Sequence, residues 1–397
     1  MLIRGHGECA APEACSRTPC CRPSAWDDAR AIAYQAATAL PPSQVALAEA
    51  VGGVLAEPLR AVVSVPLVNC SAMDGYAVCG PSPWSVVACL RAGDGVPPPL
   101  RSGTACEVAT GAPIPPYAVA VLPYEHAWRT GESVNGLVKP GQHIRQAGEE
   151  CAAGDQVLPA GALVSPTVLG LAAALGHDTL CVRRTPRVLA IITGDELLDA
   201  GLPFPGRVRD AIGPMLPGLV AWAGAHFDGA TRLADSAALL IAALRAADGD
   251  MILVSGSSSR GPADHLRCAL AVLGAELIID GVACRPGHPQ VLARLTTGPL
   301  VVGLPGNPLA AVVAFLTLAL PAITGLRGRP LPALTPTTAR RNCPGITRLV
   351  PVRVRGNDIT ELPHTRSAML RGIAAADALA IVTPCGAVRL HAVPGSA

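Results

Sequence analysis

The sequence predicts a central α/β domain with a mostly parallel sheet, flanked by β-rich domains. Between residues 185 and 328, short apolar runs alternate with helical segments, which is typical of a sheet covered by helices. Residues 66–140 and 329–397 instead contain short β-like runs separated by Gly and Pro. The chain has 397 residues, half of them hydrophobic, which is enough for several such domains.

Composition divides the chain into five parts. Four cysteines among the first 21 residues follow no regular spacing, so we interpret this stretch as a disordered extension with reduced thiols; a metal-binding tail is the alternative. The predicted parts are this extension at 1–25, a linker or helical domain at 26–65 and 141–184, a small β-rich domain at 66–140, the α/β domain at 185–328 and a C-terminal β-domain at 329–397.

The N-terminal half is predicted to contain three helices and three strands. A Pro41-Pro42 break separates the first two helices, and Ser43 fits the N-cap position of the second. Gly176 follows the third helix, where a left-handed backbone is favoured. The helices are expected at 27–40, 43–55 and 167–175, and the strands at 76–79, 107–110 and 118–122.

The α/β domain begins with residues 188–192, a continuous apolar run of the kind found in parallel strands buried on both faces. Its first helix is weakened by Pro214 and Pro217. Strands are expected at 188–192, 251–254, 277–279, 291–295 and 300–302, and helices at 207–225, 236–247, 262–273 and 309–320; the C-terminal strands are expected at 349–354, 380–382 and 388–390.

Charge and hydropathy exclude several classes of protein. The 31 basic and 29 acidic residues form no basic stripe, so we expect no nucleic-acid partner. The apolar run 309–326 contains Pro321 and two threonines, which favours a buried core helix over a membrane span. The N-terminus lacks the apolar segment of a secretory signal, so a cytoplasmic location is expected.

Three predicted strands end in loops of unusual composition, at residues 193–196, 255–261 and 303–308. In an open α/β sheet, ligands bind beyond the carboxyl ends of the strands. The middle loop combines small residues with a following helix N-terminus, a combination that suits phosphate. An ordinary Gly/Ser turn is the alternative.

Carboxylates accompany these loops. Asp195 and Glu196 follow the end of one strand, and Asp264 lies in the first helical turn after the 255–261 loop. Carboxylates close to a phosphate repel it unless a hard cation lies between them, so the pattern predicts Mg²⁺ held by Glu196 and Asp264. The alternative role for each is helix N-terminal capping.

Three loops outside the α/β domain are also polar: residues 70–78, 110–115 and 145–150. Taken alone, each is more often a solvated loop than a site. In order along the chain, however, all these segments resemble the MoeA family, whose eukaryotic relative is the E domain of gephyrin. The motifs stand at 69–78, 110–115, 148–150 with 153–161, 192–197, 255–261, 285–289 and 305–308, and the resemblance extends over about residues 26–326.

The resemblance implies an activity, molybdopterin molybdenumtransferase. Such an enzyme inserts molybdate into adenylylated molybdopterin and releases AMP, with Mg²⁺ polarising the pyrophosphate. It also implies a molybdopterin-binding type of α/β domain in an elongated, four-domain subunit, a homodimer, and a molybdoenzyme or cofactor-chaperone partner. Two alternatives remain: a catalytically impaired member that acts as a molybdopterin-binding scaffold, and an unrelated oxidoreductase, which the absence of GxGxxG after the first strand disfavours.

The resemblance also implies roles for individual residues. The 255–261 loop would cradle a phosphate or the pterin end, and positively charged side chains would attract molybdate. The implied catalytic residues are Glu196, Asp264, Asp235, Thr110 and Glu150. The implied substrate-binding residues are Asn69, Ser71, Asp74, Arg145, Gly256, Ser257, Ser259, Gly261, Arg285, His288, Pro305, Gly306, Asn307 and Pro308.

Some positions depart from the family pattern. Asn69 replaces an aspartate, so it can accept a hydrogen bond but supplies no charge. Glu150 also replaces an aspartate, and the 255–261 loop has Ser257 and Ser258 in place of Gly and Val. Arg285 and His288 replace two lysines, so anion binding at His288 is expected to weaken as pH rises.

Overall fold

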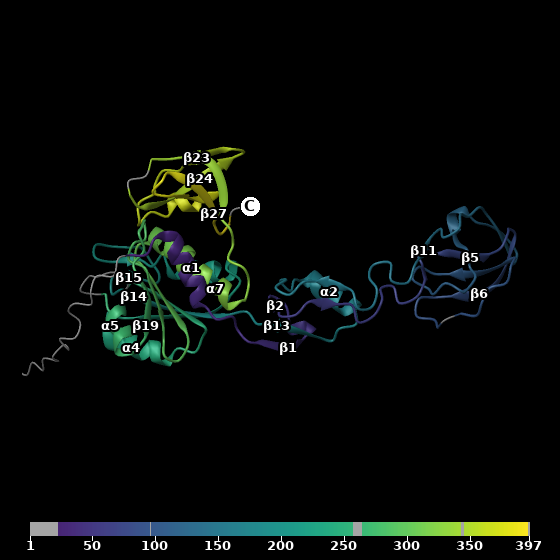
Figure 1. Ribbon diagram of the computed structural model, residues 1–397, viewed down its shortest axis with the longest axis horizontal. Helices are drawn as coiled ribbons and strands as arrows, with labels where there is room; N and C mark the ends of the chain where they lie inside the picture. The colour runs from purple at the N-terminus through teal and green to yellow at the C-terminus, as the bar shows by residue number, and fades with distance from the viewer. Residues whose placement is uncertain (1–22, 96, 257–263, 343–344, 396–397) are drawn as a thin grey trace, which may run out of the picture. The chain divides into compact units, whose positions relative to one another are not determined.

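The computed structural model describes residues 23–95, 97–256, 264–342 and 345–395 (Figure 1). The chain forms two compact units: unit 1 contains residues up to 41 and from 183 onward, and unit 2 contains residues 42–182. The predictions for the cysteines of the N-terminal extension and for Ser257, Ser258, Ser259 and Gly261 lie outside the described residues. Residues 26–41 belong to unit 1, whereas the sequence grouped them with 141–184.

Unit 1 is built on a six-stranded sheet. Strands β14 (Arg187–Thr193), β17 (His226–Leu233), β18 (Met251–Ser255) and β22 (Leu300–Leu304) are parallel, and β21 (Val291–Arg294) and β19 (Glu276–Asp280) form an antiparallel edge; the order is β17-β14-β18-β22-β21-β19. The sheet is therefore mixed, with a parallel run formed by β17, β14, β18 and β22. Strand β17 was not predicted, because its sequence HFDGATRL has neither an apolar run nor clean alternation.

Helices cover this sheet: α3 (Leu216–Trp222), α4 (Ala237–Ala246), α5 (Leu266–Val272), α6 (Pro308–Ala314) and α7 (Leu320–Leu326). Ser236 caps α4 as expected, accepting the Leu239 N–H. The helix predicted at 207–225 is wrong in its first half, where β16 (Val208–Arg209) pairs with β15 (Leu197–Leu198). Helix α3 begins only beside Pro214 and Pro217, since proline is tolerated in the first turn and not inside a helix.

A π-helical segment (Phe315–Ala319) joins α6 and α7 into one helix from 308 to 326. By length and composition this helix could cross a membrane, but it is entirely buried in unit 1, as the core-helix prediction expected. Thr317 and Thr324 donate hydrogen bonds to the carbonyls four residues earlier. Helix α1 (Trp26–Ala36) packs on this segment, and Trp26 Nε1–H donates to Thr317 Oγ1 at 2.9 Å.

The C-terminal residues of unit 1, shown in yellow-green in Figure 1, form a β-sheet together with one short strand from the α/β domain. Its strands are β20 (Cys284–Arg285), β23 (Thr335–Arg340), β24 (Thr347–Arg355), β25 (Asp358–Glu361), β26 (Ala378–Val382) and β27 (Ala387–Ala392), with the short helix α8 (Arg371–Ala374). Leu349, Leu379 and Ile381 belong to the same hydrophobic core as Phe315, so this sheet and the α/β sheet share one core.

Unit 2 contains a six-stranded sheet of order β8-β5-β7-β6-β10-β9, a three-stranded sheet β1-β13-β2, and helix α2 (Pro166–Ala174). Ser165 caps α2, and Gly176 has the expected positive φ. The strands are β1 (Pro42–Ala46), β2 (Val54–Leu55), β3 (Leu59–Arg60), β4 (Cys70–Ser71), β5 (Gly75–Cys79), β6 (Trp84–Leu90), β7 (Thr104–Val108), β8 (Ala120–Pro123), β9 (Trp128–Thr130), β10 (Ser133–Asn135), β11 (Ile144–Arg145), β12 (Gln156–Leu158) and β13 (Thr179–Arg183).

The helix predicted at 43–55 is wrong. Residues 42–46 form β1, a 3₁₀ turn (Leu47–Glu49) follows, and Val54–Leu55 form β2. Ser43 therefore lies within a strand and caps no helix. Gly52 has a φ of 78°, a left-handed conformation that ends a right-handed helix, and β1 pairs with β13, which lies far away in the sequence.

Candidate functional site

The carboxyl ends of three parallel strands meet at one edge of the unit 1 sheet. Ile192 of β14 pairs with Ser255 of β18, and Ser255 pairs with Leu304 of β22. Thr193 Oγ1–H donates to the Ser255 carbonyl at 3.1 Å, which joins the first two strand ends. The loops at 193–196, after 255 and at 305–308 therefore start side by side, as predicted.

Two glycines make this edge compact. Gly256 has a φ of 98°, and a Cβ on it would lie 2.3 Å from the Thr193 carbonyl oxygen. A Cβ on Gly306 would lie 3.6 Å from the Gly256 Cα. The backbones after β14, β18 and β22 thus approach so closely that only glycine fits at 256. A ligand at this edge can be approached by backbone atoms as well as by side chains.

Acidic residues occupy the loops that follow β14 and β17. The Asp195 N–H donates to Asp235 Oδ2 and the Asp235 N–H donates to Asp195 Oδ1, both at 3.2 Å. Arg207 donates to the Asp195 carbonyl at 2.6 Å. These bonds hold the two loops together and leave each carboxylate further acceptor capacity.

The proposed metal ligands lie on neighbouring loops. Glu196 is exposed and follows Asp195, and Asp264 is half-buried just before α5. Among the residues that the structure describes, no group of three or more His, Cys, Asp or Glu side chains has the arrangement of a metal site. The magnesium site remains a prediction.

A cavity of about 390 Å³ beside this edge was not anticipated from the sequence; Ile192 and Ala230 form part of its wall. Arg232 contributes a cation to it and forms ion pairs with Asp199 and with Asp210, the latter at 3.1 Å. The sequence reasoning missed these three residues because it recognised no strand at 226–233 and read residue 210 as part of a helix. Because β17 has neither an apolar run nor clean alternation, the sequence offered no clear signal for them.

The 285–289 turn lies against helix α6, which follows the 305–308 loop. Gly287 has a φ of 96°, and a Cβ on it would lie 3.3 Å from the Ala310 carbonyl of α6. Arg285 and His288 are exposed, and His288 Nδ1–H donates to the Val282 carbonyl at 2.8 Å. This bond orients the ring and leaves Nε2 available.

The start of α6, directly after Asn307 and Pro308, is capped from the C-terminal domain. The Leu309 and Ala310 N–H groups donate to the Ser367 carbonyl at 2.9 and 3.2 Å. Two of the helix's first donors are therefore already used by the protein. Ser367 was not predicted as a neighbour of this loop, since nothing in the sequence links the two.

In unit 2, the loop containing Ser71 lies against the 110–115 loop. The Ser71 N–H donates to the Ala112 carbonyl at 2.9 Å, and the Gly111 N–H donates to the Ser71 carbonyl at 2.8 Å. The buried Ser71 hydroxyl donates to the Met73 carbonyl at 2.6 Å. Ser71 therefore shapes the turn and is not available to a ligand through its proton.

Asp74 and Thr110 form a polar pair in unit 2 that is joined by two hydrogen bonds. Asp74 Oδ1 accepts the Thr110 N–H at 2.6 Å and the Thr110 hydroxyl at 2.9 Å. These bonds lower the pKa of the exposed Asp74 carboxyl, the backbone bond contributing most. Asp74 is thus held as an oriented carboxylate at neutral pH.

The 145–150 segment completes this group. Asn69 Oδ1 accepts the Ala147 N–H at 2.8 Å, and Arg145 pairs with Cys70 across strands β11 and β4. The Glu150 N–H donates to the Val65 carbonyl at 3.0 Å. The structure therefore brings Asn69, Asp74, Thr110, Arg145 and Glu150 into one region of unit 2, and all five side chains are exposed.

A parallel sheet with glycine-rich and acidic loops at its carboxyl edge is the architecture of proteins that bind phosphorylated ligands. Residues 24–176 match the MoeA N-terminal region (domains I and II), and residues 189–325 match a probable molybdopterin-binding domain. Over 314 residues the chain is 37% identical to molybdopterin molybdenumtransferase 2 of Mycobacterium tuberculosis, which covers 73% of this chain and 76% of that one. This chain belongs to the molybdopterin molybdenumtransferase family.

Two further relatives agree. The molybdopterin molybdenumtransferase of a Nostoc species is 33% identical over 299 residues, covering 70% of this chain and 67% of that one. The crystal structure of the molybdopterin biosynthesis MoeA protein of Pyrococcus horikoshii superposes with a TM-score of 0.73 at 22% identity, covering 94% of this chain and 98% of that one. The fold is therefore MoeA-like, with several domains and mixed sheets.

Proposed function

We propose that this chain inserts molybdate into adenylylated molybdopterin and releases AMP, as a cytoplasmic homodimer. The observation that carries the proposal is the sheet edge of unit 1, where the ends of β14, β18 and β22 meet and Gly256 and Gly306 approach each other. Acidic loops from β14 and β17 stand at the same edge. A pyrophosphate ester needs this combination of backbone donors and carboxylates that can share a cation.

The residues at this edge suit magnesium in their chemistry. Asp195, Glu196, Asp235 and Asp264 offer only oxygen donors, and carboxylates in small number together with substrate phosphates are what Mg²⁺ accepts. In the proposal Glu196 and Asp264 bind the ion. Asp195 and Asp235 hydrogen-bond to each other and so hold their two loops together. When bound, the ion supplies positive charge to the pyrophosphate oxygens.

Positively charged residues account for the second substrate. Molybdate is a dianion, and Arg285 and His288 are exposed on the turn that packs against α6. Arg285 offers permanent charge and forked donors, whereas His288 offers the Nε2 position of an oriented ring. In unit 2, Arg145 is a further cation, and the Asp74 carboxylate is fixed by Thr110. We assign these residues to substrate positioning.

The test is molybdate-dependent release of AMP from adenylylated molybdopterin by the purified full chain. Glu196→Gln and Asp264→Asn remove one carboxylate charge each while keeping the shape of the side chain, so each variant is expected to lose AMP release and retain pterin binding. Asp248→Asn is the matched control, because Asp248 is exposed in the loop before β18, at the opposite end of the sheet.

Normal turnover by both Glu196→Gln and Asp264→Asn would show that the acidic site is misassigned. The scaffold alternative makes a different prediction, namely that the wild-type chain binds the pterin and releases no AMP. Rescue of cofactor formation in a bacterium that lacks its own insertase separates the two, since only an active enzyme restores the cofactor.

A further inference from the structure

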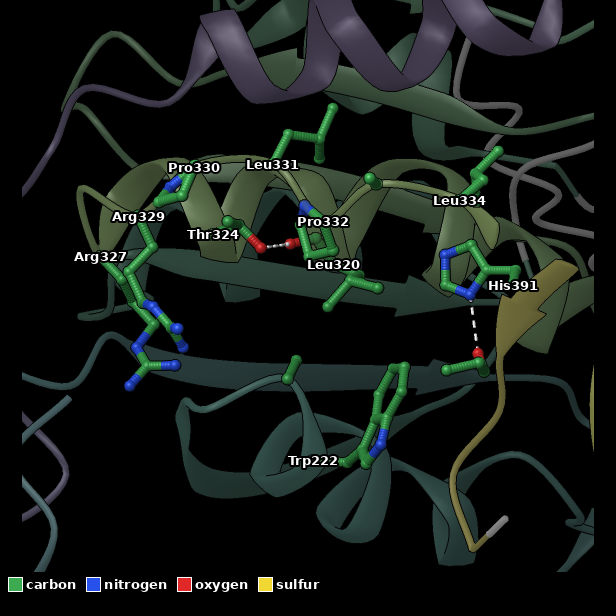
Figure 2. A pocket seen from close by; sticks show the side chains of 13 residues that line it. Trp222, Leu320, Thr324, Arg327, Arg329, Pro330, Leu331, Pro332, Leu334 and His391 are labelled. Atoms are coloured by element: carbon green, nitrogen blue, oxygen red, sulfur yellow. Dashed lines mark hydrogen bonds between the residues drawn. The ribbon is translucent and has the colours of Figure 1, made fainter. Parts of the chain in front are cut away.

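A cavity of about 550 Å³ lies in unit 1 beneath the segment 329–334, which leads into the C-terminal sheet (Figure 2). Helices α3 and α7 and strand β27 supply the other walls. None of the residues assigned above to the proposed reaction lines this cavity. The cavity is therefore separate from the residues of the proposed reaction.

One end of the cavity is strongly basic. Figure 2 shows the side chains of Arg327 and Arg329 side by side at this end. Arg327 is only 7% exposed, and its pKa is lowered first by burial and then by the charge of Arg329. The Arg329 Nε is buried and has no hydrogen-bond partner among the residues that the structure describes.

No acidic side chain is among the described residues that line this cavity. The two adjacent guanidinium groups make this end of the cavity electropositive, which favours an anion over a neutral or cationic group. Because guanidinium groups offer forked donors, a carboxylate or phosphate group fits this end best.

The opposite end of the cavity offers a hydrogen-bond acceptor. His391 is 5% exposed, and its Nδ1 lies 2.7 Å from the Ala392 carbonyl, which can only accept. The proton therefore sits on Nδ1, and Nε2 carries a lone pair. Nε2 is buried, finds no partner in the described part of the chain, and points into the cavity in Figure 2. A buried acceptor without a donor is costly, so a ligand hydroxyl or N–H would stabilise it.

The stretch between the two ends is apolar. Leu320 and Pro332 lie between the arginines and His391 in Figure 2, and Trp222 stands on the wall opposite Pro332 with 38% of its surface exposed. The Thr324 hydroxyl is not available as a donor, since it already donates to the Leu320 carbonyl at 2.8 Å. A flat apolar body packs well between an indole ring and aliphatic side chains.

We propose that this cavity binds a small aromatic oxyanion. Its carboxylate or phosphate group meets Arg327 and Arg329, its ring packs between Trp222 and Pro332, and a hydroxyl at the far side of the ring donates to His391 Nε2. The volume suits one small molecule of this class. The inference is independent of the molybdenum chemistry, because it uses none of the same residues.

The test is calorimetric titration of the full chain with four probes: inorganic phosphate, phenyl phosphate, 4-hydroxyphenyl phosphate and 4-hydroxybenzoate. The hydroxylated aromatic anions are expected to bind tightest, and comparison of the two shows which anionic group is preferred. Arg329→Gln should weaken both by about tenfold, the usual loss for one charge-assisted hydrogen bond. Arg371→Gln is the matched control, an exposed arginine of the same unit outside the cavity, and should change nothing.

Two further variants keep the proposal falsifiable if Arg329→Gln does not fold. His391→Asn keeps a donor near the Nδ1 position and removes the Nε2 acceptor, so it should weaken 4-hydroxyphenyl phosphate several-fold and leave phenyl phosphate unchanged. Trp222→Ala should weaken the aromatic probes and leave inorganic phosphate unchanged. Equal affinity of wild type for inorganic phosphate and the aromatic anions, or no binding of any probe at millimolar concentration, would falsify the proposal.

Discussion

At residue 69, the side-chain amide of an asparagine links two loops of unit 2. Asn69 Oδ1 accepts the Ala147 N–H at 2.8 Å, and an aspartate oxygen could accept the same bond. The substitution therefore preserves the link between the 69 loop and the 145–150 segment. Only the negative charge at this exposed position is absent.

Restoring the charge gives the first residue-scale prediction. Asn69→Asp should keep the Ala147 bond, raise AMP release if that charge assists the reaction, and change the free energy of unfolding by less than about 0.5 kcal/mol. Asn69→Ala is the control, because it removes the bond and should lower both stability and turnover. The measurements are steady-state AMP release and urea unfolding. Unchanged or lower turnover in Asn69→Asp would mean that the active protein is adapted to the amide.

The Asp74–Thr110 pair gives the second residue-scale prediction. Because two bonds from Thr110 lower the pKa of Asp74, the carboxylate stays charged to a lower pH than usual. Thr110→Val removes the hydroxyl bond and keeps the backbone bond, so the pKa of Asp74 should rise part of the way to its ordinary value. Carboxyl-carbon NMR titration measures this directly. Thr110→Ser, which keeps the hydroxyl, should titrate like wild type; an identical midpoint in Thr110→Val would count against the pair.

At the scale of elements, the site depends on close approach of three strand ends. Gly256 combines a φ of 98° with a Cβ position only 2.3 Å from the Thr193 carbonyl oxygen. Gly298 has a φ of 114° and open space around its Cβ position. The two glycines share the backbone strain that a side chain would suffer and differ only in contact, so they form a matched pair.

We expect Gly298→Ala to lower the free energy of unfolding by about 1 kcal/mol through strain alone. Gly256→Ala should cost about 2 kcal/mol more, because the strand ends must also separate. Urea unfolding of both variants measures the difference. Equal costs would mean that the strand ends β14 and β18 are not in the close contact described.

The two wrong helix predictions have a common cause at this scale. Residues 43–55 and 207–225 contain apolar residues at helical spacing, yet parts of both segments form strands. Strand β1 pairs with β13, which is distant in the sequence, and β16 pairs with β15, which precedes it by about ten residues. Local spacing reports only which face can be buried. Whether that face belongs to a helix or a strand is decided by a partner that local sequence does not reveal.

At the scale of the whole molecule, a hydrophobic core of unit 1 is shared by chain segments from both ends of the sequence. Helix α1, the long helix from 308 to 326 and the C-terminal sheet all contribute to it. The Trp26–Thr317 bond and the ion pair of Asp27 with Arg389 join the same three elements. The α/β and C-terminal domains of the sequence prediction are therefore expected to unfold together.

This core buries a titratable group. Burial lowers the pKa of His391 from 6.5 to about 4, so the folded unit holds the ring neutral while the unfolded chain protonates it below pH 6.5. The free energy of unfolding should therefore fall as pH drops from 6.5 to 4, by up to about 3 kcal/mol. Above pH 6.5 both states are neutral and this contribution to pH dependence disappears.

His391→Asn should flatten that dependence, because the variant has nothing to protonate. Urea unfolding of the full chain between pH 7 and pH 4, with hydrogen exchange in unit 1 to locate the change, measures the slope. His364→Asn, at an exposed site with a positive φ that asparagine tolerates, is the control and should keep the wild-type slope. A slope unaffected by His391→Asn would place the acid sensitivity elsewhere.

The sequence by itself determined the class of fold, the strands predicted at 188–192, 251–254 and 300–302, and the family, because long apolar runs and contiguous motifs are local signals. It also predicted which loops lie at the sheet edge, since parallel strands present their carboxyl ends together. Only the tertiary structure decided the antiparallel edge of β19 and β21, the Asn69–Ala147 and Asp74–Thr110 bonds, the Arg232 cavity and the basic cavity beneath residues 329–334. These features depend on contacts between residues far apart in the chain, and such contacts leave no periodic trace in the sequence.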